Sequence, residues 1–266
     1  MATFRQRLAR GETLVGPFIS IDSPDLVELI GHAGWDFALI DCEHAPFGNE
    51  SVADLARACK ASGLHTVVRV PANEDWLINK ALDVGAEAVV VPQIDSLESA
   101  RKAADAAKYA PRGHRGANPF TRAGDYHGRG GLDYYRRANE ETMLILMVEG
   151  AGGAAAIDEI VGLENVDAVF FGPVDLSHSL GLPGQIDHPR VIAKIREMLA
   201  LARGQGKVAG LFANDVERAR FWMGEGAQFV AFGVDANIIF HAFSDLLARL
   251  KVPATGRKAE GNEEEA

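Results

Sequence analysis

Short hydrophobic runs recur along the whole chain at nearly even spacing, and they alternate with amphipathic stretches. The runs are almost continuous and rich in Val, Ile, Leu and Phe, as expected of parallel strands that are covered on both faces. We predict strands at residues 14–19, 36–41, 65–70, 87–92, 143–148, 167–172, 207–212 and 228–233. Strands that alternate with helices in this way predict an α/β fold, a single (β/α)8 TIM barrel.

The predicted helices have recognisable start and stop residues. In SPDLVELIGHAG, Ser23 is the expected N-cap, Pro24 lies in the first turn and Gly34 ends the helix. NEDWLINKALDVGA and DVERARFWMGEGA are further helix candidates that end near a glycine. A doubly wound sheet is the alternative fold, but the first predicted strand is not followed by the G-x-G-x-x-G fingerprint of dinucleotide-binding sheets.

Composition and charge exclude several classes of partner. The formal net charge of -10 at pH 7 argues against binding to a nucleic acid backbone, which requires a positive surface. The sequence contains no charge-free run of about 18 apolar residues and no signal peptide, so we predict no membrane association. Cys42 and Cys59 are too few for a disulfide framework, and we expect a cytoplasmic protein.

Two segments stand apart from the regular alternation. Residues 110–141 are rich in Gly, Arg and aromatic residues, and a connection of that length is usually functional or involved in assembly. The end of the chain, GRKAEGNEEEA, has the composition of a solvated, disordered tail. We therefore expect one barrel domain over residues 1–251 and a disordered acidic tail over residues 252–266.

Polar residues gather where the predicted strands end. In barrel enzymes the active site is built at the carboxyl ends of the strands. A single charged residue at a strand end is explained equally well without a function, because a buried strand must reach the solvent where it ends. Charged groups on several successive strands instead predict one shared mouth. The residues concerned are Asp41, Glu43, His44, Arg69, Gln93, Glu149 and Asp175.

These residue types support a narrow range of chemistry. Glu149 and Asp175 offer hard oxygen ligands from adjacent strands, which suit Mg²⁺ or Mn²⁺. Arg69 offers a cation for an oxyanion or a carboxylate. His44 can exchange a proton near neutral pH, and Asp41 could orient its imidazole. A metal, a cation and a base around one pocket indicate enolate chemistry at a 2-oxo acid.

Four segments together resemble a known family. DFALIDCEHAPF, VVRVP, the VE pair at 148–149 and FFGPVDLSHSLG are similar to signature segments of the HpcH/HpaI family of metal-dependent class II pyruvate aldolases. The likeness runs from about residue 11 to 250, with order and spacing kept. It implies a divalent metal ion (Mg²⁺, Mn²⁺ or Co²⁺) and an aldolase that cleaves or forms 4-hydroxy-2-oxo acids, with pyruvate and an aldehyde as partners.

The resemblance also implies roles for individual residues. His44 would be the catalytic base, and Arg69 would stabilise the enolate. Glu149 and Asp175 would hold the metal. The predicted substrate contacts are Arg69, Met147, Gly172, Pro173, Val174 and Asp175, with the backbone of residues 172–174 meeting the pyruvate carboxylate. Met147 stands where the family often has Gln.

Two further implications concern assembly. Asp83 matches a family residue that supports the histidine, and because it would lie at the far end of its helix, we expect it to act across a subunit contact. The last predicted helix, ANIIFHAFSDLLARL, has more apolar surface than one outer barrel face needs. With the resemblance, it predicts a homo-oligomer, a hexamer built as a trimer of dimers that exchange or dock their final helices.

Two other functions remain open at this stage. A lyase of the citryl-CoA or malyl-CoA type would use the same metal enolate but needs a basic groove for its nucleotide, which the acidic chain does not indicate. A non-catalytic barrel that binds a 2-oxo acid is the other alternative. A Schiff-base aldolase is disfavoured, because Lys207 lies at the wrong end of its strand and the remaining candidates are predicted to be helical. They are Lys60, Lys80, Lys102, Lys108, Lys194 and Lys251.

Overall fold

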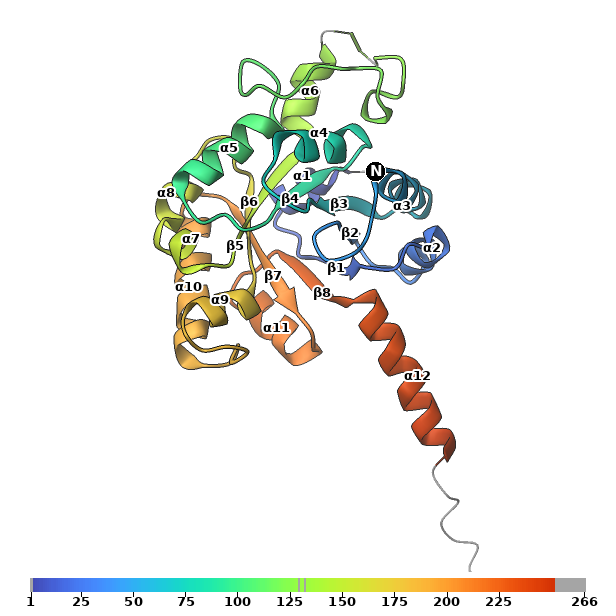
Figure 1. Ribbon diagram of the computed structural model, residues 1–266, viewed down its shortest axis with the longest axis vertical. Helices are drawn as coiled ribbons and strands as arrows, with labels where there is room; N and C mark the ends of the chain where they lie inside the picture. Colours follow the sequence, from blue (N-terminus) through green and yellow to red (C-terminus); the bar gives the residue numbers. More distant parts are fainter. Residues whose placement is uncertain (1, 129, 132, 252–266) are drawn as a thin grey trace, which may run out of the picture.

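The computed structural model describes residues 2–128, 130, 131 and 133–251, and its centre is a closed barrel of parallel strands in the order β1 to β8 (Figure 1). The predicted (β/α)8 barrel is therefore confirmed. The strands begin and end within about a residue or two of the predicted positions. They are β1 (Leu14–Ile19), β2 (Phe37–Asp41), β3 (His65–Arg69), β4 (Ala88–Val91), β5 (Met143–Val148), β6 (Ala168–Phe171), β7 (Val208–Ala213) and β8 (Phe229–Val234).

Helices surround the barrel, and the predicted N-cap of the first outer helix is confirmed. The Ser23 hydroxyl accepts a hydrogen bond from the backbone N–H of Leu26, and Gly34 follows the helix with a φ of 91°. The helices are α1 (Phe4–Ala9), α2 (Pro24–His32), α3 (Asn49–Ser62), α4 (Asp75–Asp83), α5 (Leu97–Ala107), α6 (Asp133–Glu141), α7 (Ala151–Ala155), α8 (Ile157–Val161), α9 (Pro173–Ser179), α10 (Pro189–Gly204), α11 (Val216–Gly224) and α12 (Asp235–Lys251), with a short 3₁₀ helix at Arg122–Gly124.

Side chains fill the inside of the barrel, because alternate residues of each strand point inward. Near the amino ends of the strands, Phe4 from α1 packs against Phe37 and Phe229, with ring centroids 5.8 and 5.6 Å apart. Gly16 makes room for this packing, since a Cβ there would overlap the carbonyl oxygen of Phe37. The same alternation carries Asp41 and Arg69 inward at the opposite, carboxyl end.

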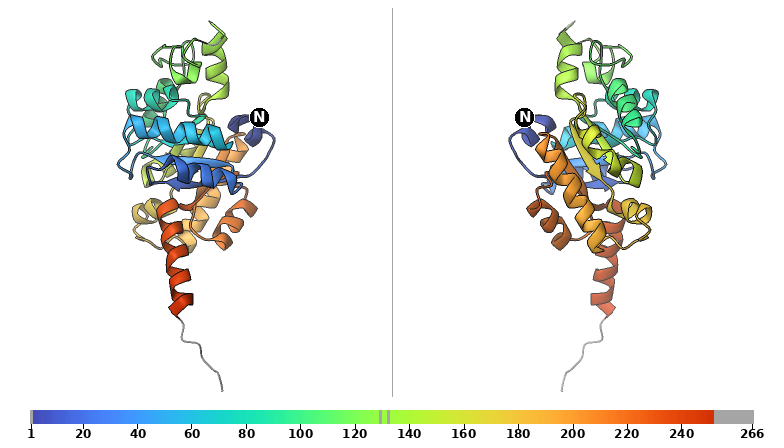
Figure 2. Two further views of the ribbon diagram at one scale, coloured as in Figure 1. Left: turned by 90° about the vertical axis from the view of Figure 1, so that its right-hand side faces the viewer. Right: turned by 90° about the vertical axis from the view of Figure 1, so that its left-hand side faces the viewer.

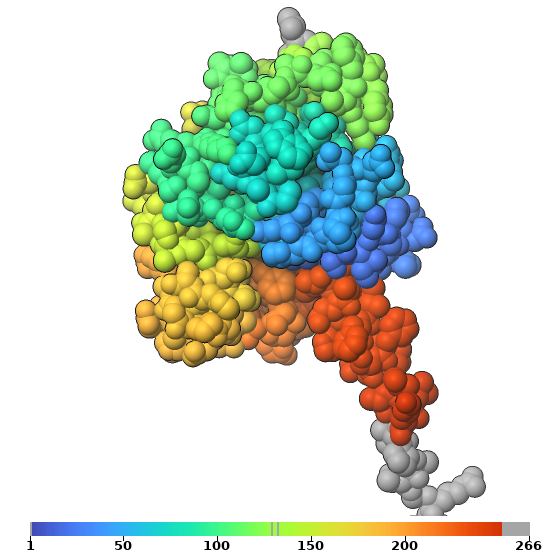
Figure 3. Space-filling view, viewed as in Figure 1, coloured from blue at the N-terminus to red at the C-terminus, as the bar shows by residue number. Residues whose placement is uncertain are grey.

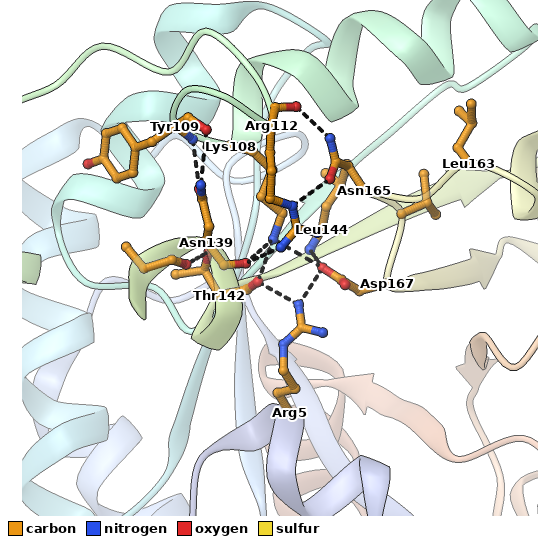
Figure 4. Close-up of polar contacts among 12 residues, drawn as sticks. Arg5, Lys108, Tyr109, Arg112, Asn139, Thr142, Leu144, Leu163, Asn165 and Asp167 are labelled. Atoms are coloured by element: carbon orange, nitrogen blue, oxygen red, sulfur yellow. Dashed lines mark hydrogen bonds and ion pairs between the residues drawn. The ribbon is translucent and has the colours of Figure 1, made fainter. Parts of the chain in front are cut away.

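A buried polar network joins α1 and α6 to the amino ends of β5 and β6 (Figure 4). The Lys108 ammonium donates to the carbonyl oxygens of Asn139 at 3.1 Å and Thr142 at 2.8 Å. Its Nζ lies 3.4 Å from Asp167, which also pairs with Arg5 at 2.7 Å. Lys108 was predicted to be helical, but it lies just after α5 and is fully buried.

Two elements extend away from the barrel in opposite directions. Figures 1 and 2 show α6, the end of the long 110–141 segment, at one extreme of the molecule and α12 at the other. In the space-filling view α12 stands clear of the body (Figure 3). The predicted acidic tail at 252–266 lies outside the described residues. None of the helices within the described ranges is long and apolar enough to cross a membrane.

Candidate active site

Asp41 and Arg69 are direct partners in the pairing of β2 with β3, and both are buried. The guanidinium donates two hydrogen bonds to the Asp41 carboxylate, one from Nε at 2.9 Å and one from Nη2 at 2.8 Å. Its third nitrogen, Nη1, lies 2.9 Å from Glu43. A planar guanidinium held by two carboxylates has little freedom to rotate, so its charge stays at a fixed place in the mouth.

Asp41 also shapes the turn after β2. One of its oxygens accepts the backbone N–H groups of Glu43 at 3.0 Å and His44 at 3.4 Å. The sequence suggested that Asp41 orients the His44 imidazole, whereas the contacts within the described residues join it to Arg69 and to the backbone of this turn. The His44 side chain is exposed at the rim of the mouth. Asp41 therefore holds the backbone of His44 in place and sets the orientation of the Arg69 guanidinium.

Gln93 links two carboxylates of the mouth, a role that the sequence did not indicate. Its backbone N–H donates to Glu149 at 3.0 Å, and its side-chain amide donates to Glu43 at 3.0 Å. Gln93 has a φ of 57°, a left-handed conformation that is uncommon for residues other than glycine. Such a conformation persists where surrounding contacts hold it, and it is frequent at functional sites.

Glu149 is the most perturbed acid of the site. Burial raises the pKa of its carboxyl group to about 7, and the charges of Glu43 and Asp175 act in the same direction. The Gln93 N–H and the Arg69 charge oppose the shift only in part. The ionised form of Glu149 is thus destabilised, which is the situation that a bound cation would relieve.

The donors present fit a divalent metal ion that keeps several water molecules. Glu149 and Asp175 supply carboxylate oxygens from the ends of β5 and β6, the ligand type that Mg²⁺ and Mn²⁺ prefer. A Cβ at Gly172 would lie 2.8 Å from Glu149 Oε2, so the glycine keeps this side of the carboxylate open. Among the described residues, no group of three or more His, Cys, Asp or Glu side chains forms a metal cage. Water or substrate would have to complete the coordination.

The mouth contains two adjoining cavities that share His44 and Asp175. The first, of about 610 Å³, is lined by polar residues that include Glu43, Gln93 and Glu149. The second, of about 260 Å³, is lined by Arg69, by hydrophobic side chains and by the 172–174 segment. Met147 belongs to this second cavity, and its sulfur lies 3.7 Å from Arg69 Nη1.

Most of the predicted site residues are therefore brought together, but Asp83 is not. It ends α4 and accepts a hydrogen bond from Arg115 at 2.7 Å, outside both cavities of the mouth. The expectation for Lys207 agrees with the structure. Lys207 donates to the carbonyl oxygens of Leu163 and Val166 before β6, and no lysine lines either cavity within the described ranges.

Cys42, in the turn after β2, is poorly suited to act as a nucleophile. Burial raises the pKa of the Cys42 thiol to about 12, and the negative charge of Asp41 adds to the shift. At neutral pH the group is a neutral thiol, which attacks carbon poorly.

A closed barrel with a fixed arginine and the carboxylates of Glu149 and Asp175 at its mouth has the arrangement expected of a barrel enzyme that acts on an anionic substrate. Residues 14–242 match the family model HpcH/HpaI aldolase/citrate lyase, and the chain belongs to that family. The resemblance seen in the sequence and the prediction of a carbon–carbon lyase of the aldolase type are thereby confirmed.

Individual relatives cover almost the whole chain. A hydroxypyruvate/pyruvate aldolase of Roseobacter denitrificans is 36% identical over 250 residues, which are 94% of this chain and 97% of the relative. A 2-keto-3-deoxy-L-rhamnonate aldolase of Escherichia coli is 33% identical and spans 97% of both chains. The crystal structure of the citrate synthase SbnG superposes with a TM-score of 0.86 at 33% identity, covering 94% of this chain and 97% of that one.

Proposed function

We propose that this enzyme cleaves and forms 4-hydroxy-2-oxo acids, with pyruvate and an aldehyde as the products of cleavage. The observation that carries the proposal is that Glu149, whose pKa is raised to about 7, shares the mouth with the buried Arg69, whose charge acts on that carboxyl group. The aldolase names of the relatives support it.

Enzymes of this family generally depend on a divalent metal ion, and this chain has carboxylates that could bind one. We propose that Glu149 and Asp175 hold a divalent ion, Mg²⁺, Mn²⁺ or Co²⁺. When bound there, the ion would act as a Lewis acid that polarises the 2-oxo acid. The two acids give the cation a charge partner inside a partly desolvated mouth, and the Gln93 N–H keeps Glu149 in one orientation.

Arg69 is proposed to stabilise the negative charge that develops on pyruvate. All three guanidinium nitrogens contact Asp41 or Glu43, and the Arg69 side chain lines the cavity that also contains Met147 and the 172–174 segment. The backbone of Gly172, Pro173 and Val174 lines the same cavity and is proposed to meet the pyruvate carboxylate.

His44 is proposed to be the general base that takes the proton from the 4-hydroxyl during cleavage and returns it during synthesis. Its position on the border of the two cavities places it between the acids and the hydrophobic part of the mouth. Proton transfer by a positioned imidazole typically contributes about 10²–10⁴-fold to the rate.

We further propose that the protein is a cytoplasmic homo-oligomer, a hexamer built as a trimer of dimers. One face of α12 is apolar and exposed in the single chain, and a second copy is the expected cover. The residues are Ile238, Phe240, Phe243, Leu246, Leu247 and Leu250. In such an assembly Asp83 of one subunit is proposed to support His44 of another.

A retro-aldol screen tests the activity directly. A panel of 4-hydroxy-2-oxo acids is incubated with enzyme and Mg²⁺, Mn²⁺ or Co²⁺, and released pyruvate is detected with lactate dehydrogenase. We expect metal-dependent pyruvate release that EDTA abolishes. Full activity after EDTA, or a borohydride-trapped adduct with pyruvate, would contradict the mechanism. Turnover of CoA thioesters alone would favour the citryl-CoA or malyl-CoA lyase alternative. That alternative needs basic side chains for the nucleotide, and among the Lys and Arg residues in the described part of the chain only Arg69 lines the two cavities.

A further inference from the structure

The turn after β4 lies between the strand that carries Arg69 and the strand that ends at Glu149, because β4 pairs with β3 on one side and β5 on the other. We propose that Gln93, in this turn, is a positioning residue with two separable contributions. Its backbone N–H orients Glu149 toward the cation site, and its side-chain amide holds Glu43 in contact with Arg69. The inference rests on the function proposed above and adds a residue to it.

The side-chain amide of Gln93 completes a chain of polar contacts across the mouth. Glu43 Oε1 accepts from Gln93 Nε2 at 3.0 Å, and Glu43 Oε2 lies 2.9 Å from Arg69 Nη1. The two oxygens thus have different partners, and the carboxylate cannot rotate without losing one of them. The Glu43 side chain is 9% exposed, so its orientation depends on these two contacts more than on water.

The backbone contribution of Gln93 depends on its left-handed conformation. With a φ of 57°, its N–H donates to Glu149 Oε1 at 3.0 Å. The next residue is anchored, because the Ile94 N–H donates to the carbonyl oxygen of Met147 at 3.1 Å. A change of φ at Gln93 would therefore have to turn the peptide group that carries the Gln93 N–H. A glycine would adopt this φ with less strain, and the contact with Glu43 is what the glutamine side chain supplies in its place.

Two adjacent glycines of α7 hold the turn from behind. A Cβ at Gly153 would overlap the carbonyl oxygen of Ile94, and a Cβ at Gly152 would lie 2.6 Å from the carbonyl oxygen of Asp95. Without side chains at these positions, α7 packs directly on the backbone of residues 94–95. Since α7 begins two residues after Glu149, the segment that carries this carboxylate also supports the turn that donates to it.

The test separates the two contributions with two substitutions at one position. Gln93→Gly keeps the left-handed conformation and the N–H but removes the amide. Gln93→Val removes the amide, and because a β-branched residue disfavours positive φ, it also turns the N–H away from Glu149. Gln205→Val is the matched control, since it changes an exposed glutamine at the end of α10.

Two quantities are measured for each variant. The Kd of Mn²⁺ is measured by calorimetry without substrate and reports on Glu149. The kcat for exchange of the pyruvate methyl protons with D₂O is measured at saturating Mn²⁺ and pyruvate. This exchange reports enolate formation, the step that Arg69 is proposed to assist, and it needs no aldehyde.

We expect Gln93→Gly to bind Mn²⁺ within about 2-fold of wild type while its exchange kcat falls roughly 10-fold. Gln93→Val should show the same kinetic loss and should also raise the Mn²⁺ Kd by roughly 10–100-fold, the usual effect of removing a partner of a metal-binding carboxylate. Gln205→Val should match wild type in both measurements.

Equal Mn²⁺ Kd values in Gln93→Gly and Gln93→Val would overturn the role of the backbone N–H, and an unchanged exchange kcat in Gln93→Gly would overturn the role of the amide. If Gln93→Val does not fold, Gln93→Ala disturbs φ more mildly and takes its place in the Mn²⁺ comparison.

Because Mn²⁺ binding is measured without substrate, this inference and the aldolase function can fail separately. A wild-type protein that binds Mn²⁺ but neither exchanges pyruvate protons nor cleaves any 4-hydroxy-2-oxo acid contradicts the aldolase function, whereas the Mn²⁺ comparison still decides on the N–H. An active wild-type enzyme whose Gln93 variants match it in both measurements contradicts only the role of Gln93. A wild-type protein that binds no Mn²⁺ contradicts both.

Discussion

Asp41 and Arg69 lie side by side on β2 and β3 and form a buried ion pair through two parallel hydrogen bonds of 2.9 and 2.8 Å. The backbone ladder between the two strands determines this contact, so the guanidinium is placed by the barrel itself and not by a mobile loop. Because the charge is oriented before substrate binds, little reorganisation is needed when an enolate forms.

Arg69→Ala should therefore lower kcat/KM for retro-aldol cleavage roughly 10²–10³-fold, the usual loss for an oxyanion partner. The substitution also leaves Asp41 and Glu43 without their cation, so the free energy of unfolding should fall by about 3–5 kcal/mol. Mn²⁺ binding, measured by calorimetry, should remain. Asp41→Asn is the matched variant, since it keeps the arginine and loosens its orientation, and its kinetic loss should be smaller. A near-normal kcat in Arg69→Ala would remove Arg69 from the mechanism.

His44→Ala should lose aldol cleavage by about 10²–10⁴-fold while it still binds metal and pyruvate. Oxaloacetate decarboxylation forms the pyruvate enolate without a proton from a hydroxyl group, and this reaction should survive in the variant. Both activities can be followed through pyruvate release. If cleavage is unimpaired in His44→Ala, Glu43 becomes the candidate base, and Glu43→Gln would test it. If the variant loses metal binding, His44 is a metal ligand and not the base.

The metal-free protein should lose stability as pH rises from about 4.5 to about 7. In the folded state Glu149 keeps its proton up to the raised pKa of about 7, whereas the unfolded carboxyl releases it near 4.5. The free energy of unfolding therefore decreases across this pH range, by about 3 kcal/mol in total. Urea unfolding in EDTA at several pH values measures the slope.

A divalent ion should remove that penalty, because it replaces the proton as the charge partner of Glu149. Added Mn²⁺ should raise the unfolding midpoint more at pH 7.5 than at pH 5. Glu149→Gln serves as the control, and it should flatten the pH dependence and abolish the response to Mn²⁺. A response to Mn²⁺ that persists in this variant would place the ion elsewhere.

The exposed face of α12 should hold the subunits together. Phe240 and Phe243 are 64% and 71% exposed in the single chain, which is unfavourable in water. Phe243→Asp should shift the protein toward smaller species in light scattering at micromolar concentration. Asp245→Ala changes a neighbouring polar residue and should leave the mass unaltered. A wild-type monomer under these conditions would refute the assembly and would leave Asp83 remote from any active site.

The strands were predictable because buried parallel strands are continuous hydrophobic runs, and the residues that follow them necessarily gather at one end of a closed barrel. For that reason Arg69, Glu149 and Asp175 could be placed at the mouth from sequence alone. The side-chain partner of Asp41 could not be predicted from sequence. Proximity in the chain suggested His44, whereas the register between β2 and β3 places Asp41 beside Arg69.

Other features depend on closure of the barrel. Phe18 and Phe212 are far apart in sequence, and their contact exists only because β1 pairs with β8 and β8 with β7. The left-handed conformation of Gln93 has no sequence signature, since residues other than glycine rarely adopt it. The burial of Lys108 likewise depends on acceptors contributed by Asn139 and Thr142.

The allocation of the mouth to two sets of strands has an evolutionary consequence. The aromatic residues on β1 and β7 and the charged residues on β2, β3 and β5 are carried by separate stretches of chain. Mutations at Phe18 or Phe212 can thus accumulate without altering the register that joins Asp41 to Arg69. Barrels of this design can diversify the hydrophobic part of the mouth after gene duplication while the strand pairing that holds Arg69 is inherited unchanged.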